Sequence, residues 1–119
     1  MKLDFHEDFC QVYTSDPAAA PGRIESIVET IEPYVDFVPA EPALRQHIAA
    51  AHTDMHIQNV ENQGLYEIAA LAAGGAIQSA QIGLSEPCFG LIRPPGHHAS
   101  AASSWGFCYF NNMAIALEA

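Results

Sequence analysis

Hydrophobic residues recur along this chain at spacings that predict several helices. In residues 23–31 they occupy every third or fourth position, as on one helix face, and Pro33 ends the pattern. The same spacing is longest over residues 65–82, and Gly83 stands where a helix commonly stops. Pro42 suits the first turn of a further, shorter helix. The sequence therefore predicts at least three helices between residues 23 and 83.

Strands are predicted where apolar residues alternate or follow one another directly. Residues 1–5 alternate, and residues 34–38 favour a second short strand. Residues 88–92 are apolar on both faces, as expected of a buried strand in a parallel sheet. Loops are expected at residues 15–22 and 59–64, where turn-forming residues interrupt the pattern.

The alternation of strands with helices predicts the fold class. It is an α/β fold, layered, with a mostly parallel sheet and flanking helices. A last helix is expected over residues 113–119, with Asn112 as its cap. The length of 119 residues suits one domain, residues 1–119.

Composition and charge exclude several classes of protein. Hydrophobic residues make up 50% of the chain and charged residues 15%, which argues against intrinsic disorder. Four Lys and Arg residues oppose fourteen Asp and Glu residues, for a net charge of -10. Because nucleic acids and anionic membrane surfaces bind through cationic side chains, we expect neither as a partner.

The cysteines indicate the compartment. Cys10, Cys88 and Cys108 are odd in number and show no paired spacing, which argues against a disulfide framework or a cysteine zinc site. The first residues lack the apolar run of a signal peptide, and no apolar stretch approaches the length that crosses a bilayer. We therefore expect a cytoplasmic protein.

Candidate chemistry lies in residues 93–99, Arg-Pro-Pro-Gly-His-His-Ala, directly after the predicted buried strand. Ligands of open parallel sheets bind beyond the carboxyl ends of the strands. His97 and His98 would offer one imidazole to take a proton and another to give one near neutral pH. The alternative is a solvated or hydrogen-bonded structural pair, which spacing alone does not exclude.

Residues 93–99, taken with Gly-Phe-Cys-Tyr-Phe-Asn-Asn at 106–112, closely resemble the signature of the histone deacetylase superfamily. That superfamily includes bacterial deacetylase-like, acetylpolyamine amidohydrolase and acetoin-utilisation proteins. Weaker similarities lie at residues 21–27, 51–53 and 65–75. The resemblance implies the N-terminal portion of the arginase/deacetylase fold.

The resemblance also implies an activity, zinc-dependent hydrolysis of an acetyl-amine amide of the acetyl-lysine or acetylpolyamine type. By motif match, His98 would be the general base and then the acid for the leaving amine, with His97 as its companion. Gly106 and Phe107 would line the channel for the acylated side chain. Cys108 would lie near the metal and the acetyl group.

The metal ligands of the family lie beyond the matching segment, so the resemblance assigns no zinc ligand to this chain. We therefore expect residues 1–119 to be an incomplete, N-terminal part of a deacetylase-like domain, inactive alone. His52 and His56, four residues apart with Asp54 between them, could form a local metal site. Thr53 stands where a zinc protease needs glutamate, which favours structural histidines.

A non-enzymatic interpretation competes with this one. A truncated module would leave a strand of its parallel sheet uncovered, and an exposed strand edge invites pairing. On this alternative the chain self-associates or binds a partner. We accordingly expect a homo-oligomer or a complementing polypeptide.

Overall fold

The computed structural model describes residues 1–119 and places three parallel strands in one sheet. These strands are β1 (Lys2–Phe5), β2 (Asp36–Pro39) and β3 (Cys88–Gly90), in the order β2-β1-β3. Lys2 is in register with Asp36 on one side and with Cys88 on the other. The central strand is thus the first in sequence, and β3 forms an open edge.

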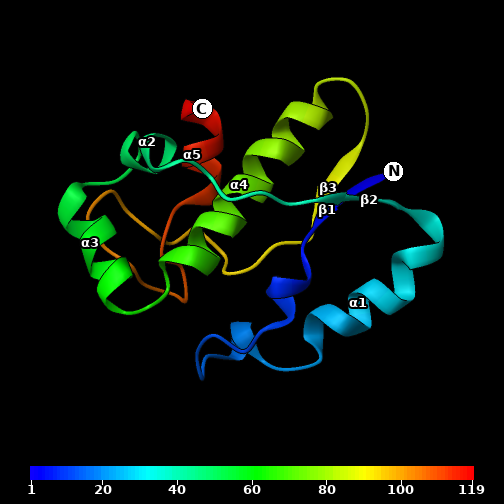
Figure 1. The fold of residues 1–119 in the computed structure, drawn as a ribbon, viewed down its shortest axis with the longest axis horizontal. Helices are drawn as coiled ribbons and strands as arrows, with labels where there is room; N and C mark the ends of the chain where they lie inside the picture. Colours follow the sequence, from blue (N-terminus) through cyan, green and yellow to red (C-terminus); the bar gives the residue numbers. More distant parts are fainter.

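Helices cover both faces of this sheet. The five α-helices are α1 (Arg23–Ile31), α2 (Arg45–Ala49), α3 (Asp54–Asn62), α4 (Tyr66–Gly83) and α5 (Asn112–Glu118). Three short 3-10 turns are η1 (Glu7–Cys10), η2 (Pro17–Ala19) and η3 (Glu32–Tyr34). In Figure 1, α1 lies on one side of the strands, and α4 and α5 lie on the other. The predicted layered α/β fold with a parallel sheet is confirmed.

Alternation along β1 divides the core into two parts. Leu3 points toward α1 and packs with Ile24 and Leu91 in a small buried cluster. The larger cluster lies on the other face and is built mainly from α3, α4 and residues 109–115. Successive strand residues face opposite sides of a sheet, so Asp4 points toward α4.

Three predicted boundaries are wrong, and in each case the structure shows contacts that the local sequence pattern does not report. The helix expected from Pro42 begins at Arg45, because the Ala43 amide donates to Ala70 of α4 at 2.9 Å. The loop expected at 59–64 is mostly helix α3, whose buried Val60 completes an apolar face. These errors concern contacts with distant parts of the chain, which local spacing does not report.

The close crossing of α4 and the segment before α2 depends on a glycine. A side-chain carbon at Gly74 would stand 2.6 Å from the Ala43 nitrogen and 2.7 Å from the Pro42 carbonyl carbon.

The third wrong boundary is the cap of α5, since the side chain of Asn111, not Asn112, accepts the Ala114 amide at 3.0 Å. Asn112 is buried and donates instead to the Pro94 carbonyl at 3.1 Å.

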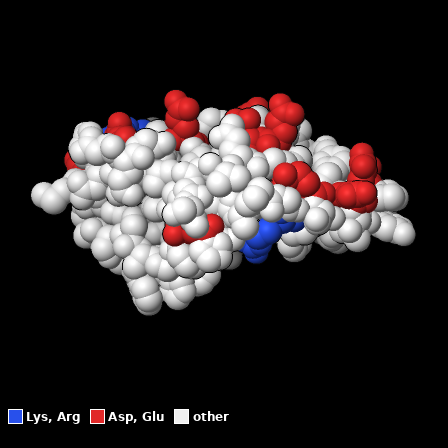
Figure 2. All heavy atoms as spheres, turned by 90° about the horizontal axis from the view of Figure 1, so that it is seen from below, with Lys and Arg blue, Asp and Glu red and all other residues white.

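The charged surface is mainly acidic, as the net charge of -10 requires. Figure 2 shows acidic groups spread over this face of the molecule, with basic groups confined to small, separate areas. None of the helices combines the length and the hydropathy needed to span a lipid bilayer.

Asp4 is a buried acid in the middle of the central strand. Neither of its carboxylate oxygens has a hydrogen-bond partner. The surrounding groups include Gly75 and Ile92, which offer no charge to it. Burial therefore raises the pKa of Asp4 to about 7.

We predict that Asp4 makes the protein less stable as the pH rises. The folded state holds the proton more tightly than the unfolded state, whose Asp pKa is about 3.9, so stability falls between about pH 4 and pH 7. The loss is a few kcal/mol, since one pKa unit is worth about 1.4 kcal/mol. Urea unfolding of wild type and Asp4→Asn across this range measures it.

The matched control for this prediction is Asp36→Asn, which removes an exposed acid from the edge strand β2. Asp4→Asn should abolish most of the decline with pH, and Asp36→Asn should leave it intact. Identical pH dependence in wild type and Asp4→Asn would contradict the account.

Candidate active site

The loop that carries the two histidines leaves the sheet directly after β3. It packs against the start of α5 at Gly96, where a side-chain carbon would lie 2.5 Å from the Asn112 nitrogen and 2.6 Å from the Phe110 oxygen. The bond from the Asn112 side chain to the Pro94 carbonyl fixes the same segment. The loop is therefore held by close backbone packing.

The first residue of this loop region, Arg93, is buried and forms five hydrogen bonds to backbone carbonyls. Its Nε donates to Phe9 at 2.5 Å. The other four acceptors are the carbonyls of Ala18 at 3.1 Å, Ala20 at 3.0 Å, Cys10 at 3.2 Å and Gln11 at 3.2 Å. A guanidinium has five N–H donors, so every donor is used.

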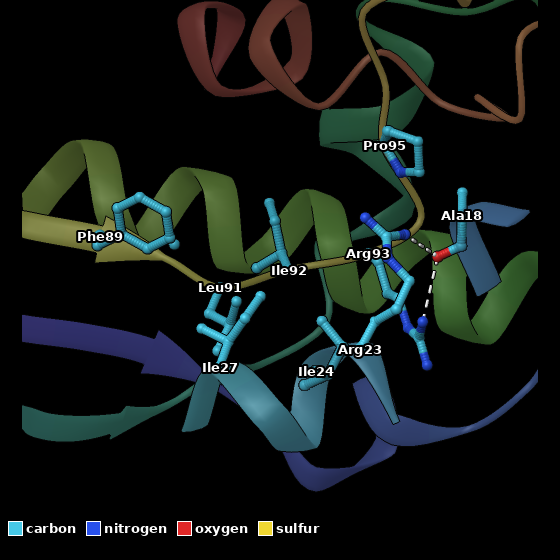
Figure 3. Close-up of a pocket in the computed structure, with 10 residues that line it drawn as sticks. Ala18, Arg23, Ile24, Ile27, Phe89, Leu91, Ile92, Arg93 and Pro95 are labelled. Carbon is cyan, nitrogen blue, oxygen red and sulfur yellow. Dashed lines mark hydrogen bonds between the residues drawn. The ribbon is translucent and has the colours of Figure 1, made fainter. Parts of the chain in front are cut away.

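Figure 3 shows one of these bonds, from Arg93 to the Ala18 carbonyl, beside a cavity of about 280 Å³ between α1 and β3. The guanidinium of Arg23, at the start of α1, also donates to the Ala18 carbonyl, at 3.0 Å. Arg93 therefore joins the histidine loop to residues 9–20, which precede α1. Its position in the sequence motif gave no sign of this role.

We predict that Arg93→Lys destabilises the protein strongly. An ammonium group offers three donors in place of a five-donor planar fork, so at least two carbonyls lose their partner. Each buried polar group left without a partner costs about 1–3 kcal/mol. Chemical denaturation should therefore report a loss of roughly 2–5 kcal/mol.

Arg23→Lys is the control, because Arg23 is exposed and donates to the same stretch of backbone. Arg23→Lys should lower the free energy of unfolding by less than about 1 kcal/mol, because exposed polar contacts contribute little to stability. Equal, small effects of the two substitutions would show that Arg93 is not a structural clamp.

His97 and His98 lie side by side. Their ring centroids are 4.3 Å apart, with 46° between the planes. His97 is exposed and borders a hollow of about 440 Å³, which Ser79, Ile92 and Met113 also line. His98 is half-buried. The loop thus brings both imidazoles to one place, while their catalytic role stays a prediction.

A tight turn faces His98. The Cys108 amide donates to the Trp105 carbonyl at 3.1 Å, and the two central residues, Gly106 and Phe107, have φ angles of 59° and 67°. Two left-handed central residues are the mark of a type I′ turn. A side-chain carbon at Gly106 would lie 2.8 Å from Cγ of His98, so this glycine lets the turn contact the ring.

The side chains of the turn differ in exposure. Phe107 is 44% exposed and is held in a backbone region that bulky residues rarely adopt. Cys108 is fully buried, and its thiol donates to the Gly106 carbonyl at 3.4 Å. Gly106 and Phe107 therefore lie on the accessible side of the turn, and Cys108 lies beneath it. Contact of these three residues with substrate stays a prediction.

Two buried histidines support the segment between the loop and the turn. His52 accepts the Asn111 amide on Nε2 at 2.9 Å, and its Nδ1 lies 3.3 Å from the Ala101 carbonyl. His56 contacts the Tyr109 carbonyl through Nε2 at 2.6 Å. Burial, and then the proximity of His56, lower the pKa of His52. The structural interpretation of this pair therefore agrees with its contacts.

We predict that acid loosens this support. His52 must be neutral to accept the Asn111 amide, and its lowered pKa means that the stability it provides is complete above the ordinary value of about 6.5. That stability is lost as the pH falls through the lowered pKa. The protection factor of the Asn111 amide, which corrects for the intrinsic effect of pH on exchange, should therefore fall as the pH drops below the ordinary histidine pKa of about 6.5.

The Ala69 amide, which donates to the Leu65 carbonyl at 3.0 Å in the first turn of α4, is the reference for this measurement. Its protection should not follow the titration of His52. If the protection of Asn111 and Ala69 changes in parallel across the range, His52 does not hold the segment.

The side chains of this chain do not make a zinc site by themselves. No group of three or more His, Cys, Asp or Glu side chains is arranged to hold a metal ion. His52 and His56 use ring nitrogens for backbone contacts. The adjacent His97 and His98 are two imidazoles without a third ligand.

Similarity to known proteins covers nearly the whole chain. A model of the histone deacetylase domain matches residues 18–119. The chain is 34% identical over 125 residues to a probable deacetylase from Archaeoglobus fulgidus, covering 89% of this chain and 33% of that protein. It is 44% identical over 59 residues to a histone deacetylase-like amidohydrolase from Pseudomonas aeruginosa, covering 47% of this chain and 16% of that protein.

A solved structure extends the likeness to the fold. The HDA15 HD domain superposes with a TM-score of 0.83 over 98% of this chain and 43% of that one. The sequence identity is 23%, so this likeness concerns the fold alone. The chain spans about a third or less of the length of the two curated relatives.

Proposed function

This chain belongs to the histone deacetylase family, and from that premise we propose that it is the N-terminal part of a zinc-dependent deacetylase. The reaction is hydrolysis of an acetyl-amine amide, of the acetyl-lysine or acetylpolyamine type. The observation that carries the proposal is the placement of the His97 and His98 rings together beside the Gly106–Phe107 turn. On this proposal zinc would polarise the acetyl carbonyl, and its ligands would be supplied by residues other than those of this chain.

The chemistry assigned to this chain is proton transfer. His98 accepts a proton from the attacking water as the water oxygen bonds to the acetyl carbon. The same proton then passes to the amine nitrogen as the carbon–nitrogen bond breaks. The products are acetic acid and a free amine, which ionise in water to acetate and an ammonium ion. An imidazole suits both steps because its ordinary pKa lies near neutrality. The His97 ring, whose centroid lies 4.3 Å from that of His98, is the neighbouring imidazole that responds electrostatically as the proton moves to and from His98.

Phe107 and Gly106 supply the substrate contact in this proposal. The half-exposed Phe107 ring offers an apolar surface to the methylene groups of an alkylamine. Gly106 has no side chain, so the acylated end of the substrate can approach His98. Cys108, fully buried, supports the turn from below.

The direct test uses the intact gene product. We expect it to deacetylate an acetyl-lysine peptide or an acetylpolyamine, and to lose this activity with a zinc chelator. Removing a general acid–base group lowers the reaction rate by roughly 10²–10⁴-fold, so the deacetylase activity of His98→Ala should be lower than that of wild type by that factor. The control is Tyr34→Ala, an exposed aromatic at η3. Activity that resists both chelation and His98→Ala would refute the proposal.

The same proposal predicts that residues 1–119 alone are inactive. Turnover by the purified 119-residue chain, with one zinc ion bound per molecule, would contradict this.

A second candidate function is self-association. One edge of β3 pairs with no other strand. Surface hollows lie on both faces of the sheet at this strand, one of them lined by Phe89 and the other by Gly90 and Ile92. Phe89 is 52% exposed, and an open apolar strand edge favours pairing with another chain. On this alternative the chain is a binding module whose β3 pairs with a second copy.

Light scattering of the 119-residue chain tests this alternative. A dimer is expected, which Phe89→Lys should convert to monomer by placing a charge at the strand edge. Leu84→Lys, at a site that is 90% exposed after α4, should leave the dimer intact. A monomeric wild-type chain would exclude self-association through β3.

A further inference from the structure

The indole ring of Trp105 lies against the His98 imidazole, and we propose that Trp105 is a positioning residue for His98. The ring centroids are 4.4 Å apart, with 44° between the planes. The inference rests on the proposed function, in which His98 transfers the proton. It adds a residue that lies just before the segment of the chain that resembles the family signature.

The turn fixes the position of this indole. Trp105 forms an isolated antiparallel bridge with Cys108, and its carbonyl accepts the Cys108 amide at 3.1 Å. Since Cys108 is fully buried, the backbone of Trp105 is anchored to the interior. The side chain remains 63% exposed, yet one part of it contacts His98. An exposed tryptophan held over a half-buried imidazole is placed for that contact, not for the core.

Three groups together define the orientation of the His98 ring. They are the His97 ring at 4.3 Å, the Trp105 ring at 4.4 Å and the backbone of Gly106, where no side-chain carbon would fit. All three contacts are packing contacts. None of the three is a hydrogen bond to a ring nitrogen of His98.

This arrangement matters because proton transfer depends on geometry. A transfer group displaced by about 1 Å can lose roughly 100-fold in rate. Offset or tilted stacking of two aromatic rings gives the imidazole a preferred plane. Without the indole, His98 would lose one of the two aromatic rings that pack against it.

The experiment compares Trp105→Ala and Trp105→Phe in the intact gene product. Trp105→Ala should lower kcat by roughly 10-fold to 100-fold while KM changes less than about twofold. Trp105→Phe keeps an aromatic ring over His98 and should restore most of kcat. Tyr34→Ala, which removes an exposed aromatic elsewhere, should match wild type.

A spectroscopic measurement separates this inference from the proposed function. A stacked indole shifts the NMR signals of the imidazole protons that it covers, so Trp105→Ala should move the His98 ring signals. His6 lies far from Trp105 in the sequence, and its ring accepts the Asp8 amide. The ring signals of His6 should therefore not move in Trp105→Ala. His98 signals that do not move in Trp105→Ala would overturn the inference.

The kinetic outcomes are equally distinct. An inactive wild-type protein refutes the proposed function, and with it the catalytic part of the role of Trp105. The other outcome is an active wild-type protein whose Trp105→Ala variant keeps its kcat, whether or not KM changes. That result overturns the positioning role and leaves the proposed function standing.

Discussion

The guanidinium of Arg93 lies inside the protein among five backbone carbonyl oxygens, and the geometry of the candidate site depends on it. A buried charge is tolerated only when its hydrogen bonds are complete, which here requires residues 9–11 and 18–20 to converge. Arg93 itself begins the loop that carries His97 and His98. The two segments therefore hold each other in place, although more than seventy residues separate them in sequence.

Other parts of the site are supported in the same way, by side chains that bind backbone. His52 and His56 reach the backbone of residues 101–111, and the Asn112 side chain reaches Pro94. Such contacts fix the path of the chain and leave the side chains at the surface free. That division explains how exposed groups such as His97 and Phe107 can be positioned by a buried framework.

The sequence predicted those features that are encoded locally. The apolar residues 88–92 predicted β3, helical spacing predicted α1 and α4, and the alternation of elements predicted the α/β fold. The motif at residues 93–99 predicted a pair of histidines just beyond β3, and the structure places their rings side by side. What failed depends on distant partners: the start of α2 is set by Ala70, and the five acceptors of Arg93 lie 73–84 positions away. The contact of Trp105 with His98 had no periodic signal, because both residues lie in irregular segments.

Hydrogen exchange of wild type and Arg93→Lys, followed residue by residue, tests the central claim most directly. If the guanidinium couples the two segments, residues 9–20 and the loop at 94–99 should lose protection together. Amides in the β1 ladder, such as Leu91 bonded to Asp4 at 3.0 Å, should stay protected. Loss of protection in one segment with full retention in the other would show that Arg93 does not couple the histidine loop to the N-terminal segment.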